Sequence, residues 1–393
     1  MALGQADFPS IAEAHLQALI DTGVPEGILV DYKAAPYGRA DADVKEFLKD
    51  ASSFANTSGG HLIIGMGEQQ GVPTAFTPVM GIDVDKEILR LESLMRDGIT
   101  PRITGALMKA VPLSSGGVAI VIRLPRSWNP PHQVSARNTN RFYVRNSGGA
   151  HEVSVDELRV LFNVSASAMD RAKAFRQERL AKISAGEGPV MLDSSPGRVT
   201  LHIVPLSAFS GRTVIDLPSV QAHAASFGPI GSTGYSPRFN FEGFINVRGG
   251  ATCQGYTQIF RNGSVEAVKV SARHTSNQQA FLPTTSIERG VIESLNSYLG
   301  GLKEIGVPPP LLGLLTIEGF RGALLAVGDR HRSYEENTPI SYDVLQLPEF
   351  VIEDYGTSAD YEKAIRPAFD AMWNAGGYPN ARSFDAEGLW TPN

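Results

Sequence analysis

Apolar residues recur at helical spacing in several segments of the chain. The clearest segment is Asp41–Ala55, which carries apolar residues at i, i+3, i+4, i+7, i+10 and i+11 from Val44 and places Lys45, Glu46, Lys49 and Asp50 on the opposite side. This pattern predicts an amphipathic helix. Comparable patterns predict further helices at residues 11–21, 85–97, 155–183, 287–302 and 361–373.

Short runs of β-branched, aromatic and other apolar residues lie between these helices. They predict strands at residues 28–33, 61–66, 103–113, 117–124, 141–145, 199–204 and 258–268, and two strands within 311–327. The Asn262-Gly263 pair predicts a hairpin with a type I′ turn, because that turn needs positive φ at both central residues.

This order of elements predicts an α+β protein, and a stretch rich in Gly, Ser and Pro at 184–196 marks a linker. We therefore expect a first domain at 1–165, a helix and linker at 166–196, and a second α+β domain at 197–393.

Composition limits the class of protein. With 42% hydrophobic and 19% charged residues, the 393-residue chain is expected to fold into globular domains. The single cysteine, Cys253, excludes internal disulfides and thiolate zinc clusters. No apolar run reaches the length of a membrane span, and the N-terminus does not resemble a signal peptide, so a cytoplasmic location is expected. No phosphate-binding Gly-x4-Gly-Lys-Ser/Thr loop occurs, which argues against a P-loop ATPase.

Glu26, Asp31, Lys33 and Glu68 are candidates for chemistry on a phosphodiester. Asp31 and Lys33 are two residues apart on one strand, so their side chains leave the same face. Carboxylates bind Mg²⁺ or Mn²⁺, and a lysine can stabilise charge on a phosphate. The alternative is that these residues are surface charges and that Lys33 is only the ion-pair partner of Asp31. In a metal site, Asp31→Ala is expected to leave the fold intact.

Three motifs together resemble the Schlafen/AlbA-like domain. They are Glu26-x4-Asp31-Tyr32-Lys33, Ala55-Asn56-Thr57-x-Gly59-Gly60-x-Leu62-x-Ile64-Gly65-Met66-x-Glu68 and Tyr143-Val144-Arg145-x-Ser147. The resemblance covers about a third of the chain and implies an α+β nucleic-acid-binding fold. In the nuclease members it also implies a three-carboxylate metal site that cleaves RNA, notably transfer RNA.

Carried over residue by residue, the resemblance implies that Glu26, Asp31 and Glu68 bind Mg²⁺ or Mn²⁺ and that Lys33 assists. This chain has Asp31 where the family usually has Glu, and Glu68 where it usually has Asp.

A basic strip is the candidate nucleic-acid contact, because the net charge of −6 gives no overall attraction to nucleic acid. It consists of Arg123, Arg126, Arg137, Arg141 and Arg145, interleaved with Trp128, Phe142 and Tyr143. Arginines bind phosphates and exposed aromatic rings stack on unpaired bases. The alternative is a solvated edge strand protected against aggregation.

These observations favour a metal-dependent endonuclease acting on RNA rather than DNA, with transfer RNA as a candidate substrate and stress or anti-phage defence as a candidate setting. Two alternatives stay open: a non-catalytic nucleic-acid-binding regulator, and a protein-interaction module that uses the second domain. The resemblance implies a groove between two such domains for a substrate as large as transfer RNA, and this sequence shows one copy of the motifs. A homodimer is therefore expected as the simplest way to form that groove, unless the second domain of the chain takes the place of the second copy. No membrane partner is expected.

Overall fold

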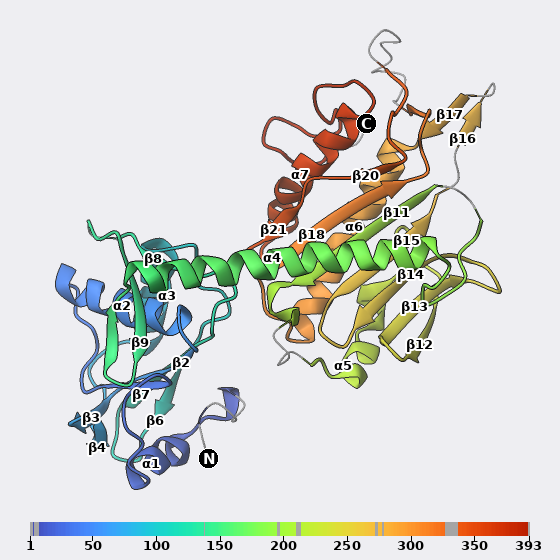
Figure 1. Cartoon of the computed structure of the whole chain (residues 1–393). Helices are drawn as coiled ribbons and strands as arrows, with labels where there is room; N and C mark the ends of the chain where they lie inside the picture. The colour runs from blue at the N-terminus through green and yellow to red at the C-terminus, as the bar shows by residue number, and fades with distance from the viewer. Residues whose placement is uncertain are drawn as a thin grey trace. The chain divides into compact units, whose positions relative to one another are not determined.

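The computed structural model (Figure 1) describes residue 3 and residues 8–136, 138–194, 197–209, 214–271, 274–276, 279–326 and 337–391. The chain divides into two compact units, Met1–Ser167 (unit 1) and Ala168–Asn393 (unit 2). The division falls inside helix α4 (Val155–Ser184), so residues 168–184, which the sequence suggested as part of a connector, belong to unit 2.

Unit 1 contains two four-stranded sheets and a small hairpin. The first sheet has the order β1-β2-β7-β6, formed by β1 (Val30–Lys33), β2 (Gly60–Ile64), β7 (Val118–Leu124) and β6 (Leu107–Pro112). The second has the order β10-β9-β8-β5, formed by β10 (Gly149–Glu152), β9 (Arg141–Asn146), β8 (Gln133–Val134) and β5 (Ile99–Thr100). The hairpin pairs β3 (Met66–Gln69) with β4 (Val72–Phe76). Among the described strands of unit 1, β1 and β2 are the one parallel pair.

Helix α2 (Asp41–Ala55) has the bounds that its sequence pattern predicts. Its apolar side packs on Leu62 and Ile122 of the first sheet and on Val134 of the second sheet. Strand β9 of the second sheet also lies against α2. Helix α2 is therefore covered on more than one side, and Asp50 and Ser53 are buried although the pattern placed Asp50 on the polar side.

The other face of the first sheet has its own core, which explains why the run at 61–66 is apolar without alternation. Ile63 and Val121 point to this face and pack with Leu16 and Leu19 of α1 (Glu13–Asp21). Helix α3 (Val84–Gly98) contributes Leu91 to the α2 core. A short 3-10 helix, η2 (Phe8–Ser10), precedes α1. The predicted helices and strands of unit 1 form close to their expected bounds, whereas the short strands β4, β5, β8 and β10 were not predicted.

Unit 2 is built on one eight-stranded antiparallel sheet. Its order is β12-β13-β14-β15-β11-β18-β20, and β21 also pairs with β18. The strands are β11 (Arg198–Pro205), β12 (Ser236–Asn240), β13 (Gly243–Gly249), β14 (Cys253–Phe260), β15 (Val265–Val270), β18 (Leu311–Glu318), β20 (Val344–Gln346) and β21 (Phe350–Ile352). A small separate sheet contains β16 (His274–Ser276), β17 (Gln279–Leu282) and β19 (Leu324–Leu325).

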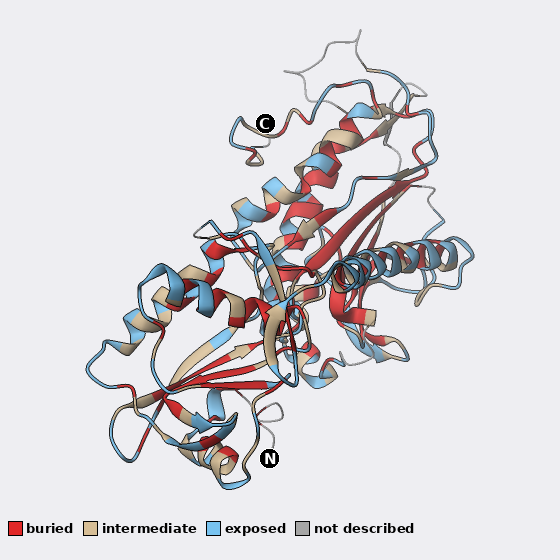
Figure 2. Cartoon of the chain, turned by 60° about the vertical axis from the view of Figure 1, so that its left-hand side comes forward, coloured by how far each residue is buried: buried red, intermediate tan, exposed pale blue. Residues whose placement is uncertain are grey.

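The large sheet is covered on both faces, and Figure 2 shows buried strands in both units. Helices α6 (Thr284–Glu304) and α7 (Ser358–Asn374) form the main apolar core with one face. The half of α4 in unit 2 covers the opposite face, where Phe175 packs against His202 and Phe260. Short helices η3 (Leu206–Phe209), α5 (Leu217–Ala222) and η4 (Ala224–Phe227) join β11 to β12.

One detail of the second-half predictions was wrong. The hairpin at 258–268 forms, but only Gly263 in its loop has positive φ (84°). The Phe260 amide donates to Ser264, so the loop is the three-residue kind with a bulge rather than a type I′ turn. The two strands predicted within 311–327 form as β18 and β19, and β19 pairs with β17; Val327 lies outside the described residues.

Candidate nucleic-acid interface and charged centre of unit 1

The predicted pair of Asp31 and Lys33 forms on β1. Lys33 Nζ lies 2.8 Å from Asp31 Oδ1 and 3.3 Å from Asp50 Oδ2. The Tyr37 hydroxyl donates to Asp50 Oδ2 at 2.7 Å. Lys33 therefore joins a carboxylate from β1 to one from α2, and Asp50 and Tyr37 are members of the centre that the sequence did not predict. The sequence pattern carried no signal for Asp50, because it places this residue on the side of α2 opposite the apolar face.

Arg145 completes this charged centre from β9. Its Nη2 donates to Asp31 Oδ2 at 2.6 Å and its Nε donates to the Gly27 carbonyl at 3.1 Å. The guanidinium stacks over the Phe54 ring at 4.1 Å, and the side chain is fully buried. The prediction of Arg145 as a phosphate contact was wrong, because β9 lies against α2 and the Arg145 side chain is buried against Asp31 and Phe54.

The charges of the centre set the direction of each pKa. Burial raises the pKa of Asp31, but the ion pairs with Lys33 and Arg145 outweigh it and leave the pKa below its ordinary value. Burial raises the pKa of Asp50 despite Lys33. Lys33 loses solvation, yet the two carboxylates raise its pKa. The two aspartates and two cations therefore form a locally balanced set.

Glu26 and Glu68 lie beside this centre. Glu26 precedes a turn closed by the Gly27 amide and the Val30 carbonyl, as expected from Pro25 and Gly27. Glu26 Oε1 accepts from the Tyr32 amide at 2.7 Å, and Glu68 accepts from the Gly71 amide. Burial raises the pKa of Glu26, and the charges of Asp31 and Glu68 add to this rise.

These carboxylates do not fit a divalent metal ion as they stand. Within the described parts of the chain, no group of three or more His, Cys, Asp or Glu side chains is arranged to hold a metal ion. The chemistry of the donors gives the reason. Both oxygens of Asp31 face cations, and one oxygen of Glu26 is used by a backbone amide.

The predicted basic strip separates into different environments. Arg123 Nε donates to His61 Nε2 at 2.9 Å and its Nη2 to the Leu3 carbonyl at 3.0 Å, so it faces the protein. Arg141 is exposed and paired with Glu152. Arg126 is exposed, and its guanidinium lies 4.8 Å from the ring centre of Trp128.

The remaining members of the strip add little open surface. Tyr143 packs at the edge of the α2 core and Phe142 is half-buried. Arg137 lies outside the described residues.

His61 is buried, and burial followed by the charge of Arg123 lowers its pKa to about 4. His61 is therefore neutral and joins β2 to β7.

The Asn56-Thr57-x-Gly59-Gly60 motif has a structural role. Asn56 Nδ2 donates to the carbonyls of His132 and Tyr143 at 3.0 and 2.9 Å, and its Oδ1 accepts from the His132 amide. Thr57 Oγ1 accepts from the Arg145 amide. A Cβ on Gly60 would collide with the Leu29 carbonyl. The motif therefore ties the end of α2 to β9 and lets the chain before β1 pass closely.

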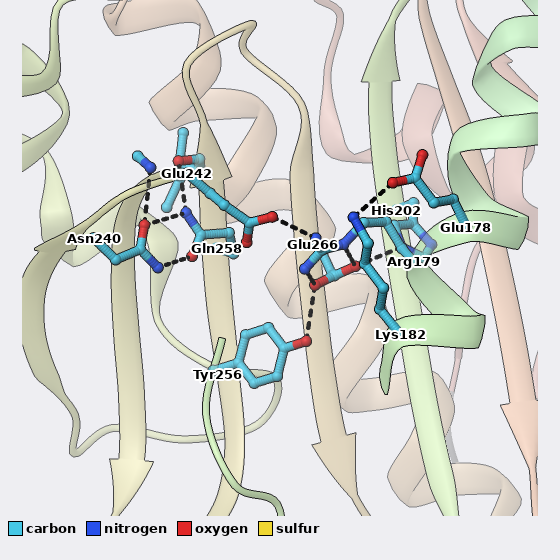
Figure 3. A network of polar contacts seen from close by, with 11 residues as sticks. Glu178, Arg179, Lys182, His202, Asn240, Glu242, Tyr256, Gln258 and Glu266 are labelled. Atoms are coloured by element: carbon cyan, nitrogen blue, oxygen red, sulfur yellow. Dashed lines mark hydrogen bonds and ion pairs between the residues drawn. The ribbon is translucent and has the colours of Figure 1, made fainter. Parts of the chain in front are cut away.

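Unit 2 contains a second charged centre that the sequence did not predict (Figure 3). Arg179 of α4 makes two hydrogen bonds to Glu266, which also contacts His202 Nε2 at 3.1 Å and the Tyr256 hydroxyl at 2.8 Å. Burial raises the pKa of Glu266, but His202 and Arg179 lower it to about 2. This centre anchors α4 to the sheet.

Comparison with known proteins identifies the class of unit 1. Residues 26–154, a third of the chain, match the family model described as Schlafen, AlbA_2. The chain therefore carries a Schlafen AlbA_2 domain. Membership of this domain family indicates a function related to nucleic acids. No curated protein matches the chain.

Among solved structures, the crystal structure of the DIP2311 protein from Corynebacterium diphtheriae is similar, with 17% identity and a TM-score of 0.24. The match covers 36% of this chain and 26% of that protein, so this chain spans about a quarter of its length. None of the described helices is long and apolar enough to cross a membrane.

Proposed function

We propose that unit 1 binds single-stranded nucleic acid without cutting it. The observation that carries this proposal is the distribution of charge along the chain. Between Gly98 and His151 there are seven Lys and Arg residues and no Asp or Glu, although the whole chain has a net charge of −6. Of these residues, Arg102, Arg126 and Arg141 are exposed, and exposed cations with few carboxylates around them attract phosphates locally.

Arg126 and Trp128 are the part of this segment best suited to a nucleic-acid strand. Arg126 is exposed and Trp128 is partly exposed, and they follow β7 in one loop. The stacked pair offers a cation for a phosphate beside an aromatic ring for an unpaired base. Arg102, which follows β5, is also exposed.

The metal-dependent RNA nuclease is the second candidate. One observation favours it: Glu26 lies close enough to Asp31 and Glu68 for their charges to raise its pKa. Against it, a metal ion would compete with Lys33 and Arg145 for the oxygens of Asp31.

Fluorescence anisotropy with labelled single-stranded RNA, single-stranded DNA and duplex DNA tests the binding proposal. Arg126→Ala should weaken binding to a single strand and reduce the slope of log affinity against log salt by about 0.7, the value for one lost phosphate contact. Arg96→Ala is the matched control, because Arg96 is an exposed arginine of unit 1 beside Asp97. Equal binding by both variants, or no binding by the native chain, would overturn the proposal.

The same RNA incubated with Mg²⁺ or Mn²⁺, and with chelator, separates the two candidates. Intact RNA that stays bound supports the non-catalytic function. Cleavage that needs the metal and disappears in Glu26→Gln would replace it with the nuclease. Light scattering of the bound and free chain tests the homodimer expected from the sequence.

A further inference from the structure

Two cations of unit 2 flank a glycine in one cross-strand row of the large sheet. Arg248 of β13 is in register with Gly255 of β14, and Gly255 is in register with Lys269 of β15. Residues directly opposite one another point to the same face of a sheet. The two cations therefore lie on one face with their Cα atoms about 10 Å apart, two strand spacings, and no side chain between them.

This is the face that packs against α6. A Cβ on Gly231, in the loop before β12, would lie 3.1 Å from Lys269 Nζ, and one on Gly290 of α6 would lie 3.7 Å from it. Both positions are glycines, so the chain leaves room around the amino group from the loop and from the helix. Because the backbones of the loop and of the helix approach it closely, the ammonium group is partly shielded from bulk solvent.

In the described parts of the chain, no carboxylate pairs with either of these cations. Among the described residues, neither Lys269 nor Arg248 has an ion pair or a side-chain hydrogen bond. Burial lowers the pKa of Lys269, and the charge of Arg248 lowers it further. A partly buried cation beside a second cation is an unfavourable arrangement that an anion would relieve.

The backbone holds this row in place. A register shift occurs between Arg248 and Gly249, and Gly249 has a φ of 115°, which favours glycine. Such bulges redirect side chains at the end of a strand. A Cβ on Gly255 would lie 2.6 Å from the Val268 carbonyl, so the close approach of β14 and β15 requires the gap between the cations.

We propose that this face of unit 2 binds a phosphate-bearing small molecule, with one phosphoryl group held between Lys269 and Arg248. A phosphoryl dianion matches two positive charges. The arginine offers a planar pair of donors and the lysine a compact charge. The site uses no residue of unit 1 and does not depend on the function proposed for that unit.

Titration calorimetry of the full chain with inorganic phosphate and with pyrophosphate tests the site. Lys269→Gln and Arg248→Gln should each weaken binding about tenfold or more, because each removes one charge-assisted contact. Lys303→Gln, an exposed lysine in the last turn of α6, is the matched control and should bind as the native chain does. Binding that is absent, or equally strong in all three variants, would overturn the proposal.

A second measurement uses the native chain and so does not depend on the folding of a variant. Acylation at pH 8 followed by mass spectrometry should modify Lys269 rapidly, because its pKa is lowered, and phosphate should protect it while leaving Lys303 reactive. Absence of protection would contradict the site. Protection by a single-stranded oligonucleotide but not by phosphate or pyrophosphate would show a nucleic-acid surface and overturn the small-molecule proposal.

Discussion

Replacing Asp31 by alanine should destabilise unit 1, in contrast to the sequence expectation that this change leaves the fold intact. Arg145 is fully buried, and Asp31 is its only ion-pair partner among the described residues. Removing one member of a buried pair leaves an uncompensated charge, which costs about 3–5 kcal/mol. Lys33 stays paired with Asp50, so the loss concentrates on Arg145.

The size of the effect makes it easy to measure. For a unit of this size each kcal/mol lowers Tm by about 2–4 °C, so Asp31→Ala should lower the Tm of unit 1 by about 6–20 °C. Hydrogen exchange read by mass spectrometry assigns the loss to peptides of unit 1. Asp97→Ala is the matched control, because Asp97 forms an exposed pair with Arg96 and should change Tm little.

A double variant isolates the pair. Arg145→Met added to Asp31→Ala should recover part of the lost stability, because the buried cation is then gone. An Asp31→Ala protein as stable as Asp97→Ala, or a double variant whose losses simply add, would refute the reasoning. The result also decides how activity is tested: a loss of cleavage in Asp31→Ala would report unfolding, whereas Glu26→Gln removes a charge outside the Arg145 pair.

Three further predictions follow from the contacts. Gly60→Ala should lower the Tm of unit 1, measured by calorimetry, well below that of Gly81→Ala. A Cβ on Gly60 would collide with the Leu29 carbonyl, whereas a Cβ on Gly81 would meet no atom within 4 Å. Equal Tm values would contradict this. Asn56→Ala should cost about 2–5 kcal/mol in chemical denaturation, since it leaves buried backbone groups unpaired; a loss under 1 kcal/mol would not fit. Glu266, with a folded pKa of about 2, stabilises unit 2 above its ordinary pKa near 4.5, and this stabilisation is lost as the pH falls toward 2. In Glu266→Gln, the free energy of unfolding should therefore depend less on pH between about 2 and 4.5 than it does in the native chain. An unchanged pH dependence would exclude the effect.

The sequence by itself determined the local structure of unit 1 and its family. Period and turn residues placed α2 at its observed bounds, and strand alternation put Asp31 and Lys33 on one face, where they form an ion pair. These properties depend on neighbours along the chain, so spacing alone predicts them. The motif residues Asn56, Thr57 and Gly60 are recognisable because they directly follow the end of a helix, although the groups that they contact lie far away in the chain.

Only the tertiary structure decided which charged groups meet and which are covered. Asp50 was assigned to solvent by the pattern of α2, but a second sheet packs over that side and turns it into a partner of Lys33 and Tyr37. Arg145 was assigned to phosphate, but β9 lies against α2 and directs its side chain to Asp31. Periodicity gives the direction of a side chain relative to its own helix or strand, whereas burial and ion pairing depend on elements that are distant in the chain. The register of Arg248, Gly255 and Lys269 is of the same kind, because strand pairing alone places these three residues in one row.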